Sequence, residues 1–555
     1  MTKKFLLILA LSGLLFGVTA PTANSQLTPE ITFGWNTLDY GHPTVNSSYF
    51  IGEGSISSNG SLYQPVIATL PQCEVLTGMK LTPSDCIESL EVMNESGRWV
   101  RGEIAKHLPV RWQPKYKKII DNAGNIVEFS EGVIDLPASS AANMFSGGRS
   151  ALWEFDGVSH ENGKQFLFNV DAYGVAINGV VDWQQGFLNS NLYPVTVTEK
   201  TNLEKSLNDN SIASYSSLES GTCVQNTSRS YCMKASTFPK DVRFRLTLRL
   251  DKAAASLNSD RWFITRTSNP TLEVKESSSY RTMVIEGAPV VVQVPTIDLP
   301  RDKDIVFAFV KSWLSSLGKI SDDLNVLIQK QADSFMTGNG YIETANNAGS
   351  TKIFAGWEPF MKYGSVKQLT GWNFTNVGSS LSSPTLQLKL SGCPKTKNIP
   401  GFVSSNSTAI EPGPPTFNTS EQTLEYRVAA PHLTESGSKN SGTYSLYVSS
   451  DTARCLWGDN LSSGKATVSI LSDDGTTQIA TSTFRSDLKG LFFNVSGFHY
   501  STGTIKVRID NQGAKSVPLA QTPKPSGKTI VCVKGKLTKK VTAVNAKCPA
   551  GYKKK

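Results

Sequence analysis

Residues 242–250 read VRFRLTLRL, and their apolar and polar side chains alternate without interruption. This period of two is typical of an antiparallel β-strand with one face on a core and the other in water. The residues expected to face the core are Val242, Phe244, Leu246, Leu248 and Leu250, and those expected to face water are Arg243, Arg245, Thr247 and Arg249. The stretch therefore predicts a β-sheet whose outer face carries arginines.

Acidic residues follow in the next two expected strands, LEVKE at 272–276 and TMVIE at 282–286. Opposite charges that face each other across neighbouring strands stabilise a sheet. We therefore expect Glu273, Glu276 and Glu286 to pair with the arginines and to neutralise a strip that could otherwise bind anions.

Strand patterns extend on both sides of this region. Residues 166–183 read FLFNVDAYGVAINGVVDW, in which Asn178-Gly179 is a strong hairpin signal. Further strands are expected at 425–430, 443–450, 466–471, 478–484, 491–498 and 504–509, with Asp474-Gly475 as a turn. Their spacing predicts a β-sandwich of about 100–120 residues within 391–510.

One segment, 301–336, has helical spacing instead. Its recurring apolar residues are Ile305, Phe309 and Trp313, then Leu324, Leu327, Ile328 and Phe335. Ser321, followed by two aspartates, is a suitable N-terminus for the second group. The segment predicts two short amphipathic helices whose aromatic residues belong to a core.

Composition and charge disfavour one class of protein, those that bind nucleic acid. The chain has 555 residues, of which 18% are charged, against roughly 25% in an average soluble protein. Its net charge of +9 is concentrated at the C-terminus, where residues 524–555 hold ten lysines and no acid. Without these lysines, Lys3 and Lys4, 43 basic residues face 46 acidic ones. This balance argues against a specific nucleic-acid-binding surface, which needs clustered basic charge.

The N-terminus has the pattern of an export signal. Lys3 and Lys4 precede an apolar stretch at 5–18, and Ala23-Asn24-Ser25 is a suitable cleavage site. The alternative is an uncleaved anchor helix. No later apolar run is long enough to span a membrane, so we expect a secreted or extracellular protein without a transmembrane span after cleavage.

The cysteines fit an exported protein. They are Cys73, Cys86, Cys223, Cys232, Cys393, Cys455, Cys532 and Cys548. Closure of short loops favours the disulfides Cys73–Cys86, Cys223–Cys232 and Cys532–Cys548, and leaves Cys393 to pair with Cys455, although eight cysteines allow 105 pairings. Zinc binding is disfavoured because no two cysteines have the required short spacing and no histidine is near them.

Residues 529–555 read TIVCVKGKLTKKVTAVNAKCPAGYKKK. This stretch resembles a tail carried by uncharacterised secreted actinobacterial β-rich proteins, in which CVKGK, KKVT and CPAGYKKK recur in this order. The segments APHL at 430–433, ARCLWG at 453–458 and GFHYS at 497–501 also resemble a β-domain of such proteins. The resemblance implies a bacterial exoprotein and brings no catalytic residues with it.

A compact cationic tail suits an anionic partner such as a cell-wall polymer or an acidic polysaccharide. The expected polyanion-binding residues are Lys534, Lys536, Lys539, Lys540, Lys547, Lys553, Lys554 and Lys555. The alternative is that the tail only aids solubility or export.

Motifs for catalysis are scarce. The five histidines show no HExxH spacing, GxSxG is missing, and the SxxK match at 316–319 lacks its partner motifs. No sequence pattern predicts a cofactor or metal. Glu154 and Asp156 in WEFDG, expected on one strand face, are the best pair for a glycosidase, which needs two carboxyl groups. Asp171 and Asp182, with Trp153, Tyr173 and Trp183 nearby, could instead bind a sugar or be solvent-facing acids beside core aromatics.

The fold class expected from these patterns is mainly β and multidomain, with antiparallel sandwich-like domains, a short two-helix insertion and a small disulfide-stapled basic tail. The expected boundaries are 1–25 for the signal peptide, 26–300 for one or two β-rich domains, 301–390 for the mixed segment, 391–510 for the sandwich, 511–528 for a linker and 529–555 for the tail. We expect a non-enzymatic binding, adhesion or structural role, with retention at the cell wall by the tail. The alternative is a secreted carbohydrate-active enzyme that uses carboxylates in 154–182.

Overall fold

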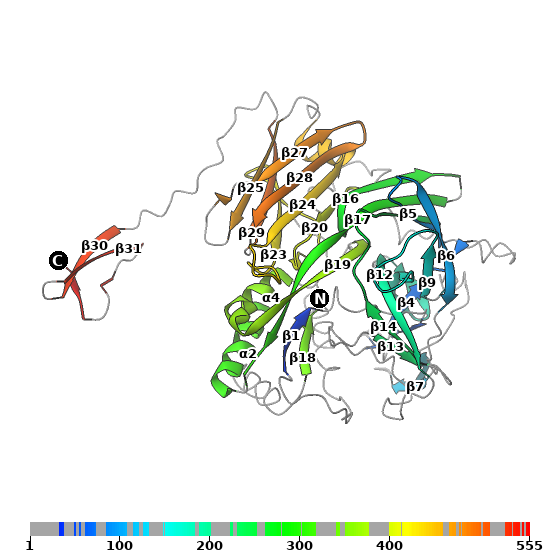
Figure 1. Ribbon diagram of the computed structural model, residues 1–555, viewed down its shortest axis with the longest axis horizontal. Coiled ribbons are helices and arrows are strands. Elements are labelled where there is room, and N and C mark those ends of the chain that lie inside the picture. Colours follow the sequence, from blue (N-terminus) through cyan, green and yellow to red (C-terminus); the bar gives the residue numbers. More distant parts are fainter. Residues whose placement is uncertain are drawn as a thin grey trace.

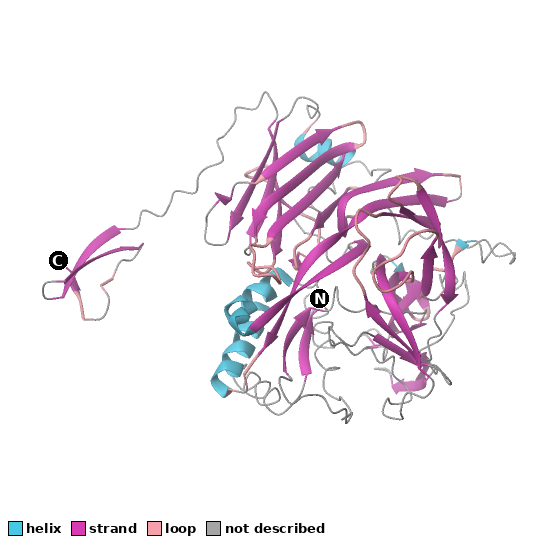
Figure 2. Cartoon of the chain, viewed as in Figure 1, coloured by secondary structure: helices cyan, strands magenta, loops and turns pink. Residues whose placement is uncertain are grey.

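The computed structural model shows a mainly β, multidomain molecule with a few short helices (Figures 1 and 2). It describes residues 33–37, 49–50, 55–56, 62–73, 85–107, 115–120, 126–131, 148, 150–183, 188–200, 222–225, 230–251, 261–278, 280–300, 302–317, 340–344, 350–376, 399–411, 413–458, 465–472, 477–478, 480–500, 503–510, 528–534, 537–543, 547–548 and 551–554. The predicted signal peptide, at 1–25, lies outside these ranges.

The long strand β17 (Tyr280–Asp298) organises the sheets. Its first half pairs antiparallel with β15 (Arg243–Asp251) and β16 (Phe263–Glu276), and its second half pairs with β19 (Gly364–Asn376). The strand predicted at 242–250 is thus confirmed as β15. At its end β17 also pairs with β1 (Phe33–Thr37), which runs parallel to β18 (Gly340–Thr344).

Paired strands close into a ring around an apolar interior. From β15 the ring continues through β5 (Cys86–Met93), β6 (Trp99–His107), β9 (Ala151–Phe155), β10 (Phe166–Ile177) and β12 (Leu188–Lys200). Strand β12 then pairs with β19, which leads through β16 and β17 back to β15 and closes the ring. Alternate residues of each strand point inward because successive side chains of a strand lie on opposite faces. The ring therefore has one dry and one outer face.

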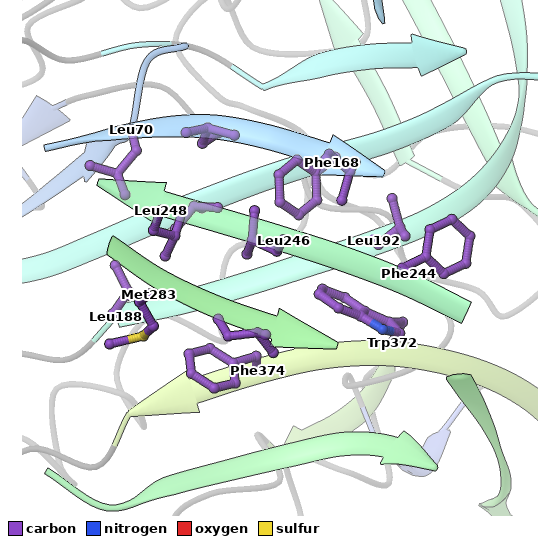
Figure 3. Packing of buried hydrophobic residues seen from close by; sticks show 14 of the residues in the cluster. Leu70, Phe168, Leu188, Leu192, Phe244, Leu246, Leu248, Met283, Trp372 and Phe374 are labelled. Atoms are coloured by element: carbon purple, nitrogen blue, oxygen red, sulfur yellow. The ribbon is translucent and has the colours of Figure 1, made fainter. Parts of the chain in front are cut away.

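The interior of the ring is filled by aromatic and branched side chains (Figure 3). Phe244, Leu246 and Leu248 of β15 are fully buried there, as predicted from their alternation. The Phe244 ring meets the Trp372 ring edge-on at 6.3 Å, and the Trp372 indole N–H donates to the Gly287 carbonyl at 3.0 Å. Truncating such a ring to Ala typically costs about 3–5 kcal/mol.

Shorter strands extend the ring. They are β2 (Tyr49–Phe50), β3 (Ser55–Ile56), β4 (Leu62–Thr69), β11 (Val180–Asp182), β13 (Thr222–Gln225) and β14 (Ser230–Ala235), with a separate hairpin of β7 (Lys115–Ile120) and β8 (Ile126–Glu131). The Asn178-Gly179 turn is confirmed between β10 and β11, and both residues have positive φ, 49° and 83°. Such angles are those of a type I′ hairpin turn.

The C-terminal half forms a two-sheet sandwich. The strands of one sheet are β20 (Gly401–Ser405), β24 (Ser441–Ser449), β28 (Gly490–His499) and β27 (Thr481–Ser486). The strands of the other are β21 (Ala409–Ile410), β22 (Thr416–Asn418), β23 (Thr423–Ala429), β29 (Gly503–Asp510), β25 (Lys465–Ser472) and β26 (Thr477–Gln478). Five of the six strands predicted here are confirmed, whereas the single strand predicted at 478–484 is divided between β26, which pairs with β25, and β27, which pairs with β28 in the other sheet. The Asp474-Gly475 turn lies outside the described residues. The helix α6 (Ser450–Trp457) follows β24 and was not predicted.

The sandwich shares structure with the ring. Strand β20 runs parallel to β16, with Phe402 opposite Phe263. Trp262 and Ile264 pack into the sandwich core beside Val403, so the ring strand β16 also serves as part of the sandwich.

Helices cover one side of this assembly (Figure 1). The first predicted helix is confirmed as α2 (Lys303–Leu317), which Asp302 caps by accepting hydrogen bonds from two backbone N–H groups. It packs with α4 (Ser350–Trp357) and the 3₁₀ helix η4 (Glu358–Tyr363) around a core that includes Phe309 and Trp313. The second predicted helix, at 321–336, lies outside the described residues. In the part of the chain that the structure describes, no helix is long and apolar enough to cross a membrane.

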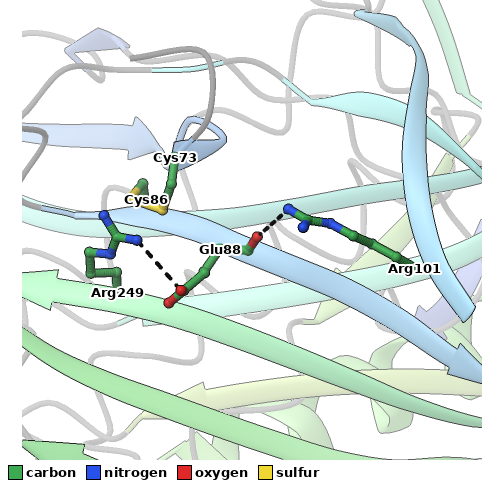
Figure 4. Close-up of a disulfide and its surroundings, with 5 residues drawn as sticks. All are labelled: Cys73, Cys86, Glu88, Arg101 and Arg249. Carbon is green, nitrogen blue, oxygen red and sulfur yellow. Dashed lines mark hydrogen bonds and ion pairs between the residues drawn. A yellow bond between two sulfur atoms is a disulfide. The ribbon is translucent and has the colours of Figure 1, made fainter. Parts of the chain in front are cut away.

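Two predicted disulfides are confirmed, Cys73–Cys86 and Cys532–Cys548 (Figure 4 shows the first). Cys223 and Cys232 lie directly opposite each other in the β13–β14 ladder, and their disulfide stays a prediction. Cys455 is disulfide-bonded, while its expected partner, Cys393, lies outside the described residues.

Candidate functional site

The C-terminal tail folds as a small sheet of its own. Strand β30 (Lys528–Lys534) pairs with β31 (Leu537–Ala543) on one side and β32 (Lys553–Lys554) on the other. Cys532 lies in the central strand, is fully buried and holds Cys548. A unit of this size is too small for a large hydrophobic core, so a covalent staple is the expected means of stabilising it.

Four lysines of this sheet have described side chains, and all of them are exposed. They are Lys534, Lys547, Lys553 and Lys554. Within the described ranges none of these four forms an ion pair, and the tail sequence contains no acid that could supply one. We call these residues the tail lysines. Their charges are therefore available to an external anion.

The remaining predicted tail residues are placed only in part. Lys539 and Lys540 belong to β31, where their backbones lie opposite Cys532 and Val531. Their side chains, and the whole of Lys536 and Lys555, lie outside the described residues.

The outer face of β15 carries the arginines that the sequence offered as a second anion-binding strip. Arg245 bonds Glu286 of β17 at 2.7 Å and Glu91 of β5 at 3.6 Å, and its guanidinium stacks on Trp99 at 3.8 Å. The predicted pairing of Glu286 is thus confirmed, and β5 supplies an acid that the sequence did not reveal.

The other arginines of this face are held as well. Arg249 lies 3.5 Å from Glu88 (Figure 4) and over the Tyr280 ring, and Arg243 donates to the Asn269 carbonyl. This face therefore holds its cations within the fold. The placement predicted for Glu276 is wrong: it bonds Arg281 at 3.0 Å, and since Arg281 lies opposite Leu250 in the β15–β17 register, this pair is on the face of Leu250 and not on the arginine face.

The pairing predicted for Glu273 is wrong. Its carboxylate binds Lys489 of the sandwich at 3.2 Å and Lys275 at 3.4 Å. Partial burial alone would raise the pKa of Glu273, but the two lysines outweigh it and lower the pKa. Glu273 therefore joins the ring to the sandwich.

The glycosidase candidates do not form a facing pair. Glu154 lies on β9, where it binds Lys164 at 2.7 Å and accepts a hydrogen bond from Gln165 at 3.3 Å. The expectation that Asp156 shares its strand face is wrong, because β9 ends at Phe155 and Asp156 lies exposed in the following turn.

The second pair of candidate acids is Asp171 and Asp182, and only Asp171 is fully buried. Asp171 is fully buried and accepts hydrogen bonds from the Thr69 hydroxyl at 2.7 Å and from the Asn169 amide. Asp182 ends β11 and lies opposite Val175, not opposite Asp171. The Trp153 and Trp183 rings are buried in the core, whereas Tyr173 is partly exposed. The polar pair Asn169 and Asp171, which interrupts the apolar run of β10, was the available signal for this buried cluster.

Two histidines have defined partners of different kinds. His160 is buried; its Nε2 faces the Gln165 carbonyl at 3.1 Å, and its Nδ1 accepts from the Asn162 backbone N–H at 3.3 Å. This pattern suits the neutral imidazole, and burial lowers the pKa of His160. The exposed His432 has an acceptor at each nitrogen, Glu358 at 3.2 Å and the Tyr500 carbonyl at 2.7 Å. Among the described residues no group of three His, Cys, Asp or Glu side chains could hold a metal ion.

Comparison with known proteins gives no relative: no family model, no curated protein and no solved structure matches this chain.

Proposed function

We propose that the protein is a secreted, surface-associated bacterial protein with a non-enzymatic binding or adhesion role, retained on an anionic cell-wall polymer by its C-terminal sheet. One observation carries this proposal: the tail lysines are exposed on a disulfide-stapled sheet and have no acidic partner in the described part of the chain. Basic charge at the surface of a compact unit attracts a polyanion and releases its counterions.

The proposal also depends on a contrast between the tail lysines and the arginines on the outer face of β15. The cations on the outer face of β15 are already bound by Glu88, Glu91 and Glu286. This face of the body therefore offers a polyanion less free charge than the tail does. The acids at 154–156 are a lysine-bound carboxylate and a turn residue, which gives the carbohydrate-active alternative no specific support.

The test is sedimentation with isolated bacterial cell walls over a salt series. We expect the full-length chain to bind strongly at low salt and to be released as salt rises. A chain that ends at Asp510 should remain in the supernatant, and walls stripped of their anionic polymers by acid extraction should lose the binding. Equal, salt-insensitive binding by both chains would contradict the proposal.

A further inference from the structure

A row of polar side chains crosses the ring on strands β10, β12, β19 and β16. Asn169 lies opposite Asn191, Asn191 lies opposite Asn373, and Asn373 lies opposite Arg266. We call Asn169, Asn191 and Asn373 the asparagine row. Residues directly opposite each other in antiparallel strands share a face and have Cβ atoms about 4.5–5.5 Å apart. Three carboxamides thus stand side by side.

The asparagine row lies on the outer face of the ring. The neighbours of these residues along each strand, Phe168, Leu192, Trp372 and Phe374, belong to the interior core. Since successive side chains alternate between faces, the three amides project away from that core. Asn191 and Asn373 are partly exposed, while Asn169 is 1% exposed.

The amides of the row retain unused hydrogen-bonding capacity. Among the described residues Asn191 and Asn373 have no side-chain hydrogen bond. Asn169 donates its amide N–H to Asp171, which fixes the orientation of the carboxamide, and its buried carbonyl oxygen has no hydrogen-bond partner. A buried polar atom without a partner costs about 1–3 kcal/mol, so Asn169 marks this part of the outer face as polar, while the accessible amides are those of Asn191 and Asn373.

The charges beside the row are bound by the protein itself. Asp171 accepts from Thr69 and Asn169. Arg266 is buried and donates to the backbone carbonyls of Ser405 and Thr408, each at 3.1 Å. In the next register position on this face, the Thr375 hydroxyl donates to the side-chain oxygen Oδ1 of Asn189 at 2.6 Å. The groups left for a ligand are therefore neutral amides, each of which can both donate and accept.

From this arrangement we propose that the asparagine row binds a neutral saccharide. A sugar hydroxyl donates one hydrogen bond and accepts others, which matches a carboxamide, and the row offers no unpaired charge to attract an anion. The hydroxyls of one or two sugar units would bond the partly exposed amides of Asn191 and Asn373, with the buried Asn169 at the edge of the site. This site is separate from the tail, and the inference does not depend on polyanion binding.

The test uses the full-length protein and three neutral probes, cellohexaose, maltohexaose and mannohexaose, with binding followed by calorimetry or NMR up to roughly 10 mM, well above a Kd of 1 mM. We expect at least one probe to bind saturably in a manner insensitive to salt. The double variant Asn191→Ala/Asn373→Ala should weaken that binding at least 10-fold. The control, Asn494→Ala, removes an exposed strand asparagine of β28 in the sandwich and should leave it unchanged.

A second variant, Asn191→Ser/Asn373→Ser, repeats the test with a smaller loss of polarity, and a thermal melt shows whether each variant is folded. Failure of all three probes to bind the wild-type protein would overturn the proposal. So would unchanged binding in both folded double variants, or binding of an uncharged extended peptide at the row in place of the sugars. Loss of wall binding by a tail variant with sugar binding intact would separate this site from the tail.

Discussion

The arginines of β15 and the tail lysines both lie on outer faces of β-sheets, but their surroundings differ. Arg245 is bonded to two glutamates and stacked on a tryptophan, and about a quarter of its side chain, 27%, remains exposed. The tail lysines are exposed and have no acid within the described part of their sheet. One set of cations is bonded within the fold, whereas the other is the set that we propose binds a partner.

The two sets of cations also differ in what they contribute to stability. Ion pairs at a partly exposed surface add little stability and fix the register of neighbouring strands. Unpaired lysines stabilise nothing, and their mutual repulsion works against the fold of a small sheet. Their concentration behind a disulfide is therefore better explained by binding than by stability.

The largest expected effect comes from removing the unpaired charge. Substituting all four tail lysines, Lys534, Lys547, Lys553 and Lys554, by Gln should weaken binding to anionic wall polymer roughly 100- to 1000-fold, since each lysine near an anionic surface contributes about 1 kcal/mol. The salt dependence measured by sedimentation should become shallower. The matched control replaces the same residues by Arg and should keep most of the affinity. Strong binding by the Gln variant would place the retention elsewhere.

The next effect concerns the staple that presents the lysines. The Cys532–Cys548 disulfide closes a loop with a sequence separation of 16, and a loop of this size contributes about 3 kcal/mol in the chain-entropy account. The variant Cys532→Ser/Cys548→Ser should unfold the tail sheet, which limited proteolysis with trypsin would detect as faster cleavage within 528–554. The melting of the body should not change. If the tail resisted trypsin as before, the staple would not be what holds it.

Local patterns predicted the elements of both regions, but not how they assemble. The alternation in β15, the Asn178-Gly179 turn, five of the six sandwich strands and two disulfides follow from near neighbours in the sequence, and the structure confirms them. Closure of the ring joins β12 with β19 across nearly two hundred residues, and nothing in either strand identifies its partner. For the same reason Glu91 was missed as a partner of Arg245, and Glu273 was assigned to the wrong cation.

The candidate sites show the same limit. The tail was recognised because its lysines and cysteines lie within one short segment. The asparagine row joins two strands that are close in the sequence, β10 and β12, to the distant β19, and each of its residues is an ordinary strand asparagine by itself. Only the register between strands makes them neighbours.

A smaller effect is expected from unpairing an arginine of the body. In Glu286→Gln the Arg245 guanidinium keeps Glu91 and Trp99, so we expect a loss of about 1 kcal/mol or less in the free energy of unfolding, measured by urea denaturation. Glu95→Gln, at an exposed turn residue, is the control and should change nothing. If Glu286→Gln increased wall binding by as much as the tail contributes, the arginines of β15 and the tail lysines would no longer differ in their availability to a polyanion.

The smallest effect distinguishes the two regions by pH. Burial lowers the pKa of His160 below its ordinary value of about 6.5, so the unfolded chain binds the proton more readily than the folded one. Its contribution to stability is therefore fully present above about pH 6.5 and is lost as the pH falls through the lowered pKa. Protonation would also set an N–H on Nδ1 against the Asn162 N–H.

The free energy of unfolding of the body should thus decline in acid, and less steeply in His160→Gln. The control His499→Gln, at an exposed site, should follow the wild type. Lysine stays charged throughout this range, so as long as the wall polymer keeps its charge, retention by the tail should persist at a pH where the body has begun to lose stability. A pH profile of unfolding identical in wild type and His160→Gln would show that the buried imidazole does not set this difference.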